Sequence, residues 1–127
     1  MQEKHLYEYA VIRVLPRVDR EEFINVGVIL YCAPKNFLRA ECAVDPARLT
    51  AFAGDADMKE LNEHLDSVCR ICKGGETGGP IGKLPIGERF RWLTAPRSTI
   101  VQTSPVHTGL TVDPENTLAE LMNKLVK

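Results

Sequence analysis

The sequence predicts an α+β domain: a mainly antiparallel sheet of about four strands, with two principal helices packed on one face. Three observations lead to this prediction. An uninterrupted apolar run at residues 26–32 is too short to span a membrane and is typical of a strand buried on both faces. Strand-like segments flank this run, and amphipathic helical patterns follow them. At 127 residues, the chain has the length of a single domain, 1–127, with a sizeable core.

Residues 6–15 form the first predicted strand. Alternation places Ala10, Ile12 and Val14 on one face, and Tyr7, Tyr9, Val11 and Arg13 on the other. Pro16 lacks the N–H group that a strand ladder needs, so it ends the strand. The second face therefore begins with aromatic rings and ends with a cation.

The apolar run at residues 26–32 forms the second strand. Gly27 lies inside it, where a missing side chain usually marks a bulge or a close approach of backbone. Residues 33–36 suit a short hairpin turn, and residues 37–44 pair back as a third strand. The simplest topology for these segments is an antiparallel three-stranded meander.

Two helices are predicted next. Asp45-Pro46 has the form of an N-cap followed by proline in the first turn, which predicts a short helix through Phe52 that Gly54 ends. The following helix, at residues 58–73, is the clearest element of the chain because its apolar side chains fall on one stripe. That stripe comprises Met58, Leu61, Leu65, Val68, Cys69 and Cys72.

Local signals also mark where helices begin and end. Asp57 and Glu60 have the spacing of a capping box, and Gly74 is placed to end the same helix in a left-handed cap. Asp113-Pro114 repeats the cap-plus-proline start and predicts a final helix. The packing face of that helix comprises Leu118, Leu121, Met122 and Leu125.

The segments between these helices carry weaker signals. The glycine-rich residues 74–80 are predicted to be a flexible loop. Residues 84–93 suit a short helix or a strand, and a helix is favoured. Residues 99–103 are predicted as the last strand, followed by a polar loop at residues 104–111.

Composition and charge narrow the classes of function. The net charge of −1 provides no overall field for nucleic acid or for an anionic membrane, so neither is expected as a partner. Neither a secretory leader nor a membrane-spanning run is visible, which indicates a cytoplasmic protein. The four cysteines are then expected as thiols. The oligomeric state is left open by these observations.

Two motifs are similar to metal or cofactor sites, and both have simpler explanations. Cys69 and Cys72 have the spacing of a zinc knuckle or a redox pair, but no second knuckle accompanies them and they lie at the end of their helix. Core packing is the favoured explanation. Residues 78–84 are similar to a phosphate loop, but Leu84 replaces the metal-binding hydroxyl and the loop follows a helix. We therefore expect no metal and no cofactor.

Polar side chains from distant segments form the best candidate ligand site. They are Arg13, Asn25, Arg97, Ser98, His107, Thr108 and Gly109. Arginine forks, hydroxyl groups and the backbone N–H groups of a glycine turn can bind an anion, and His107 can act as an acid or a base near neutral pH. The alternative is that these groups satisfy buried loop backbone. Since no nucleophile or base accompanies His107, no catalytic residue is assigned.

Three blocks of sequence occur in an order that resembles a known family. They are residues 7–16 (YEYAVIRVLP), 22–30 (EFINVGVIL) and 97–109 (RSTIVQTSPVHTG), before a closing Asp-Pro helix. The chain thereby resembles the small bacterial family known as domain of unknown function 3037, over about residues 5 to 126. The resemblance supplies no catalytic residues. It implies a small cytoplasmic bacterial protein with an accessory role, because some members are encoded beside kinases that resemble HipA.

Three functional hypotheses follow. The favoured one is a non-catalytic binding or accessory module that contacts another protein, with a HipA-like kinase as the partner that the resemblance implies. The alternative is an enzyme or ligand-binding protein for a phosphate- or carboxylate-bearing small molecule. That alternative requires four side chains, Arg13, Arg97, Ser98 and His107, to converge in one pocket. Nucleic-acid binding through the arginines near Trp92 conflicts with the charge balance.

Overall fold

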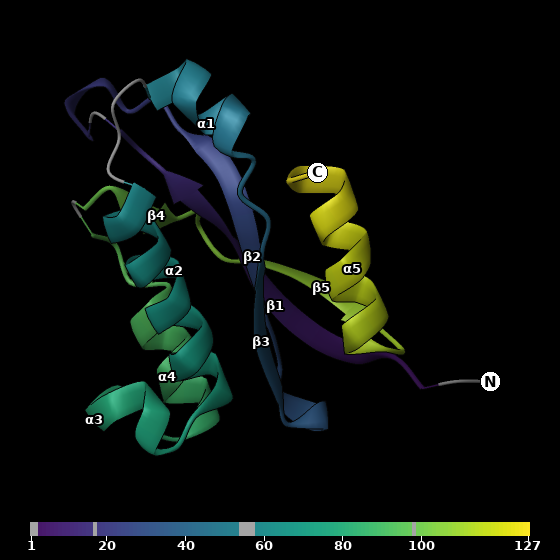
Figure 1. Ribbon diagram of the computed structural model, residues 1–127. Helices are drawn as coiled ribbons and strands as arrows, with labels where there is room; N and C mark the ends of the chain where they lie inside the picture. The colour runs from purple at the N-terminus through teal and green to yellow at the C-terminus, as the bar shows by residue number, and fades with distance from the viewer. Residues whose placement is uncertain (1–2, 17, 54–57, 98) are drawn as a thin grey trace.

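The computed structural model describes residues 3–16, 18–53, 58–97 and 99–127 of the chain. In this part the chain forms a five-stranded antiparallel sheet with helices on both sides (Figure 1). The strands are β1 (His5–Val14), β2 (Ile24–Cys32), β3 (Phe37–Cys42), β4 (Val101–Thr103) and β5 (His107–Thr111). The predicted α+β class is confirmed, with five strands in place of about four.

The first three strands form the predicted meander, with β2 paired between β1 and β3. The pairing of β1 with β2 shifts register next to Ile12, opposite Gly27, which confirms the bulge. The close approach is present too, because a Cβ atom at Gly27 would lie 2.6 Å from the carbonyl oxygen of Glu41. The bulge reverses the alternation, so that Val26 and Ile29 pack in the same cluster although three positions separate them.

Two apolar clusters cover the two faces of the sheet. The covering helices are α1 (Pro46–Ala53), α2 (Met58–Lys73) and α4 (Ile86–Leu93) on one face, and α5 (Pro114–Leu125) on the other. Figure 1 shows α2 and α4 on one side of the strands and α5 on the opposite side. Our prediction had both principal helices on one face. The structure instead places α2 and α5 on opposite faces, because β2 is apolar on both sides and each side requires cover.

Residues 107–111 form β5, which corrects the polar loop predicted for residues 104–111. β5 pairs with the first half of β1, and β4 pairs with the second half of β1. The sequence of β5 lacks an apolar alternation, since Leu110 is its only large apolar residue. Its strand character comes from the free hydrogen-bonding edge that β1 offers, which local sequence does not reveal.

The glycine-rich segment at residues 74–80 is not an irregular loop. It contains the 3₁₀ helix η3 (Glu76–Gly78) and the start of α3 (Gly79–Gly82). Gly74 and Gly75 take positive φ angles of 82° and 79°, which suit glycine, and the backbone N–H of Gly75 donates to the carbonyl of Gly82 at 3.0 Å. Its flexibility stays a prediction.

The predicted helix starts are largely confirmed. A carboxylate oxygen of Asp45 accepts from the backbone N–H of Arg48 at 3.2 Å, and Asp113 caps α5 in the same way. The helix favoured for residues 84–93 is present as α4. The capping aspartate predicted at residue 57 and the helix stop predicted at residue 54 lie outside the described residues.

Candidate functional site

Arg13 and Asn25 lie side by side on the sheet face that α5 covers. They are direct cross-strand partners in β1 and β2. Asn25 donates from Nδ2 to the carbonyl of Leu125 in α5, at 3.1 Å. The guanidinium carbon of Arg13 lies 4.0 Å from the centre of the Phe23 ring, which is a cation–π contact. The end of α5 and the Phe23 ring therefore hold this pair in place.

Two buried atoms of the Arg13–Asn25 pair have no hydrogen-bond partner among the described residues. They are the donor Nε of Arg13 and the acceptor Oδ1 of Asn25. Exchanging the oxygen and nitrogen of the carboxamide would set two oxygens against each other at Leu125, so the observed orientation is the favourable one. A buried polar atom without a partner costs about 1–3 kcal/mol. The pair therefore holds one unused donor and one unused acceptor side by side.

His107 lies in β5, against the first half of β1. It is the cross-strand partner of Tyr9, and the two ring centres are 5.3 Å apart. Tyr9 and Arg13 point to the same face of β1, but they are four positions apart, which is roughly 13 Å at the rise of a strand. His107 therefore shares a face with the Arg13–Asn25 pair without reaching it.

Thr108 and Gly109 continue β5 on alternate faces. Thr108 is exposed opposite Glu8. Gly109 lies beneath the ring of Tyr7, where a Cβ atom would lie 2.6 Å from the Cζ atom of Tyr7. The glycine is explained by the space that the tyrosine ring occupies, and not by an anion-binding turn.

Arg97 lies on the other face of the sheet, next to α4. Its guanidinium donates to the carbonyls of Trp92, Leu93 and Ala95, and it lies 4.3 Å from the centre of the Trp92 ring. The last turn of a helix leaves its carbonyls without intrahelical partners, and Arg97 satisfies several of them. Ser98 lies outside the described residues.

The predicted constellation is therefore not one site in the described part of the chain. Arg13 and Asn25 are together, whereas the β5 residues and Arg97 lie elsewhere. Ser104, which begins the segment predicted as a loop, accepts from the backbone N–H of Val11 at 2.8 Å. For Arg97 and Ser104, the explanation that polar side chains satisfy backbone groups is the correct one.

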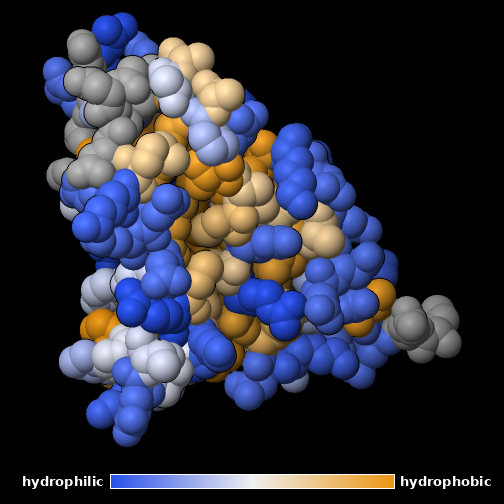
Figure 2. All heavy atoms as spheres, in the orientation of Figure 1, coloured by the Kyte–Doolittle hydropathy of each residue, from blue (hydrophilic) through white to orange (hydrophobic). Residues whose placement is uncertain are grey.

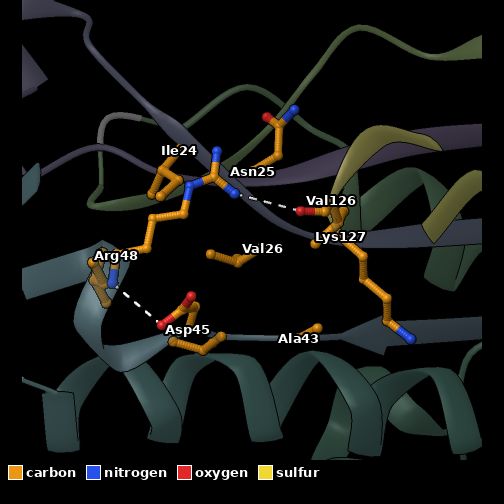
Figure 3. Close-up of a pocket in the computed structure, with 10 residues that line it drawn as sticks. Ile24, Asn25, Val26, Ala43, Asp45, Arg48, Val126 and Lys127 are labelled. Carbon is orange, nitrogen blue, oxygen red and sulfur yellow. Dashed lines mark hydrogen bonds between the residues drawn. The ribbon is translucent and has the colours of Figure 1, made fainter. Parts of the chain in front are cut away.

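A pocket of about 280 Å³ opens near Asn25, between β2, α1 and the end of α5 (Figure 3). Val26 and Ala43 lie on its apolar wall, and the Arg48 side chain crosses it to lie 3.5 Å from the carbonyl oxygen of Val126. In Figure 3 the Asn25 carboxamide points away from Val26 and Ala43. Of the predicted polar pair, Asn25 is among the residues that line this pocket and Arg13 is not.

Sequence reasoning missed a surface at the far end of β1 and β5, which we call the Leu6–Leu110 surface. Leu6 and Leu110 are direct cross-strand partners, and 56% and 64% of their surfaces are exposed. Glu8 lies on the same face and forms an ion pair with Arg91 of α4 at 2.9 Å. Alternation assigns Leu6 to the same face as Ile12, which is buried, so only the extent of helix cover distinguishes them.

Three thiols gather where α2 crosses β3. The Cys69 sulfur lies 3.9 Å from the carbonyl oxygen of Ala40. The Cys42 thiol donates a hydrogen bond to the Cys69 sulfur. That hydrogen bond lowers the pKa of Cys69 to about 7 and raises the pKa of Cys42. Burial raises the pKa of Cys72 to about 12. The partner of Cys69 is therefore Cys42 and not Cys72, with which it shares a sequence motif.

Neither a metal cluster nor a membrane-spanning helix is found among the described residues. No group of three or more His, Cys, Asp or Glu residues there is arranged to hold a metal ion. Among the helices of the same part of the chain, none is long and apolar enough to cross a membrane.

Comparison with protein families gives a match that covers most of the chain. No curated protein and no solved structure is significantly similar to this chain. The profile of one family, described as "Protein of unknown function (DUF3037)", matches residues 9–126. This match spans all five strands apart from the start of β1, and it agrees with the resemblance of the three sequence blocks. The chain therefore belongs to the DUF3037 family.

Proposed function

We propose that the protein is a small binding module that acts through contact with another protein. The observation that carries this proposal is the Leu6–Leu110 surface, where two paired leucines are each more than half exposed. Single exposed leucines are common, but two in direct cross-strand contact form a contiguous apolar site. The family resemblance suggests a kinase similar to HipA as the partner.

The composition of this surface suits a protein partner. An apolar centre with a polar rim is the usual anatomy of a binding interface, and arginine is enriched in such interfaces. Here the leucine pair forms the centre, and the ion pair between Glu8 and Arg91 lies at its border. The Glu8 side chain is 21% exposed and the Arg91 side chain 59%, so the arginine can contact a partner while it is paired with Glu8.

A binding assay with surface variants tests the proposal. We expect the double variant Leu6→Lys, Leu110→Lys to weaken binding to a purified HipA-like kinase by about tenfold or more, because both apolar contacts are replaced by charges. The control is Asn123→Lys, which adds a charge at an exposed position of α5 on the other face. Biolayer interferometry measures both affinities. Equal binding by the double variant and the wild type would show that this surface is not the contact.

A second candidate function rests on the Arg13–Asn25 pair. The unpartnered Nε and Oδ1 atoms match a ligand group that accepts and donates at once, such as a hydrogen phosphate or a protonated carboxyl group. Arg97 and His107 lie apart from this pair, so the candidate role is binding of such a molecule by the pair alone, without the four-residue pocket predicted from the sequence. Titration with inorganic phosphate, followed through the NMR signals of the Asn25 carboxamide, tests this. Signals that do not move, or that move equally in an Arg13→Met variant, would exclude it.

A further inference from the structure

The strand β3 is an open edge of the sheet. In the described part of the chain, the order β3-β2-β1-β4 leaves one side of β3 without a strand neighbour. The backbone N–H of Ala43 donates to the carbonyl of Val26, which continues the register of β2 with β3. Because hydrogen bonding alternates along an antiparallel strand, Leu38, Ala40 and Cys42 direct their N–H and C=O groups away from β2. Among the described residues these groups have no strand partner, although the C=O and N–H of Ala40 contact the Cys69 and Cys72 thiols of α2.

The surroundings of this edge are apolar. Figure 2 shows apolar side chains gathered on the near face of the molecule, between α2 and α5 and below α1. The partly buried apolar residues of β3 and the turn after it supply this strip, namely Phe37, Leu38, Ala40, Cys42, Ala43 and Val44. Natural edge strands are usually protected by proline, by several like charges or by a covering element. The Cys69 thiol lies 3.9 Å from the Ala40 carbonyl, and the Ala40 N–H contacts the Cys72 thiol; thiols form weak hydrogen bonds, which the backbone of a pairing strand can replace.

We propose that β3 pairs with β3 of a second copy of this chain, antiparallel and about a two-fold axis at Ala40. In this register, residue numbers of opposite partners add up to 80. Arg39 of each copy then lies opposite Glu41 of the other, and Leu38 lies opposite Cys42. Both charged side chains are exposed in the single chain. The strand is therefore self-complementary in charge, which is what a symmetric interface requires.

The existing contacts of Arg39 are compatible with this arrangement. Its Nη1 donates to a carboxylate oxygen of Glu115 in α5 at 3.1 Å, and a guanidinium has further donors for a second carboxylate. Glu41 has no ion pair among the described contacts with the rest of the chain. The paired sheet leaves the Leu6–Leu110 surface free, because that surface lies on β1 and β5. Pairing through β3 and partner binding at the Leu6–Leu110 surface are therefore independent, and either can occur without the other.

Charge-reversal variants test the two-fold pairing. Arg39→Glu and Glu41→Arg each place like charges opposite each other at two positions of the dimer. Sedimentation equilibrium over a range of concentrations measures the dissociation constant of the wild type and of each variant. We expect each single variant to dissociate about tenfold or more readily than the wild type. An equimolar mixture of the two variants should associate again, because every Glu then faces an Arg.

Two further variants complete the design. The double variant Arg39→Glu, Glu41→Arg restores opposite charges within one chain and is expected to dimerise like the wild type. Glu63→Arg reverses a charge on the exposed side of α2 and is expected to leave association unchanged. If the mixture re-associates, both single variants are folded, and misfolding is excluded as the reason why each dissociates on its own. A wild type that stays monomeric at all concentrations, or single reversals without effect, would overturn the proposal.

Discussion

Gly27 is the residue at which the sheet tolerates a side chain least. A Cβ atom there would lie 2.6 Å from the Glu41 carbonyl oxygen and 3.0 Å from the Cys42 sulfur. The carbonyl belongs to the ladder between β2 and β3, so it cannot move without loss of pairing. We expect Gly27→Ala to lower the free energy of unfolding by about 1–3 kcal/mol. Urea denaturation followed by circular dichroism measures this loss.

Gly109 provides the matched comparison. A Cβ atom there would also lie 2.6 Å from its nearest neighbour, but that neighbour is the ring of Tyr7. The ring is only partly buried and can rotate away, whereas backbone cannot. Gly109→Ala is therefore expected to cost less than Gly27→Ala. A loss at Gly109 equal to or larger than that at Gly27 would contradict this account of the two sites.

Cys69 is expected to be the most reactive of the three thiols at the α2–β3 crossing. Its pKa of about 7 lies below the ordinary value of 9.0, so near pH 7 about half of it is thiolate, which is the form that alkylating agents attack. The rate of modification by iodoacetamide should rise with pH to a midpoint near 7. Removing the hydrogen bond with Cys42→Ala should move that midpoint upward. Mass spectrometry of the modified peptides measures both.

Cys72 is the internal control for this measurement. Burial raises its pKa to about 12, so it stays protonated across the range in which Cys69 titrates. It should be modified last, although it lies one helical turn from Cys69. Equal rates for the two thiols, or a Cys69 midpoint unchanged by Cys42→Ala, would show that the hydrogen bond does not control the reactivity.

At the scale of the element, Arg97 belongs to α4. Its donation to the carbonyls of Trp92, Leu93 and Ala95 stabilises the end of that helix. We expect Arg97→Ala to lower the free energy of unfolding by about 1–2 kcal/mol, and Arg97→Lys to lower it by less, because lysine keeps one charged donor. Thermal denaturation compares the two variants. If both leave stability unchanged, the capping role is wrong and a ligand role for Arg97 is open again.

Elements with a strong local pattern could be predicted from the sequence, and those without one could not. The apolar run of β2, the stripe of α2 and the Asp-Pro start of α5 each carry their signal within a few residues. β5 has no such local signal, because its pairing with β1, and not its own side-chain pattern, makes it a strand. The placement of α5 opposite α2 is likewise decided by long-range packing.

The candidate site shows the same limit. Arg13 and Asn25 could be predicted to be neighbours because a hairpin-like meander pairs the end of β1 with the start of β2. Arg97 contacts the end of α4, and His107 lies in β5 at the edge of β1. Both positions are decided by the packing of the whole chain. The exposure of Leu6 and Leu110 depends on where the covering helices stop. Residue type and spacing carry no information on these points.

At the scale of the molecule, β2 joins the two halves of the core. Its side chains alternate between the cluster under α2 and the cluster under α5, so neither layer can separate without exposing one face of β2 to water. The two layers should therefore unfold in one cooperative transition. The chain contains a single tryptophan, Trp92, on the α4 side, and its fluorescence reports on that layer alone.

A substitution in the opposite layer tests this coupling. Met122 of α5 is fully buried against β2, and Met122→Ala should lower the free energy of unfolding by about 2–5 kcal/mol. If the layers are coupled, the Trp92 fluorescence midpoint in urea must fall together with the circular dichroism midpoint, although Trp92 lies on the far side of the sheet. Leu65→Ala in α2 is the reference, because it removes a contact in the tryptophan's own layer. A fluorescence midpoint that moves with Leu65→Ala but not with Met122→Ala would mean that the α5 layer unfolds independently.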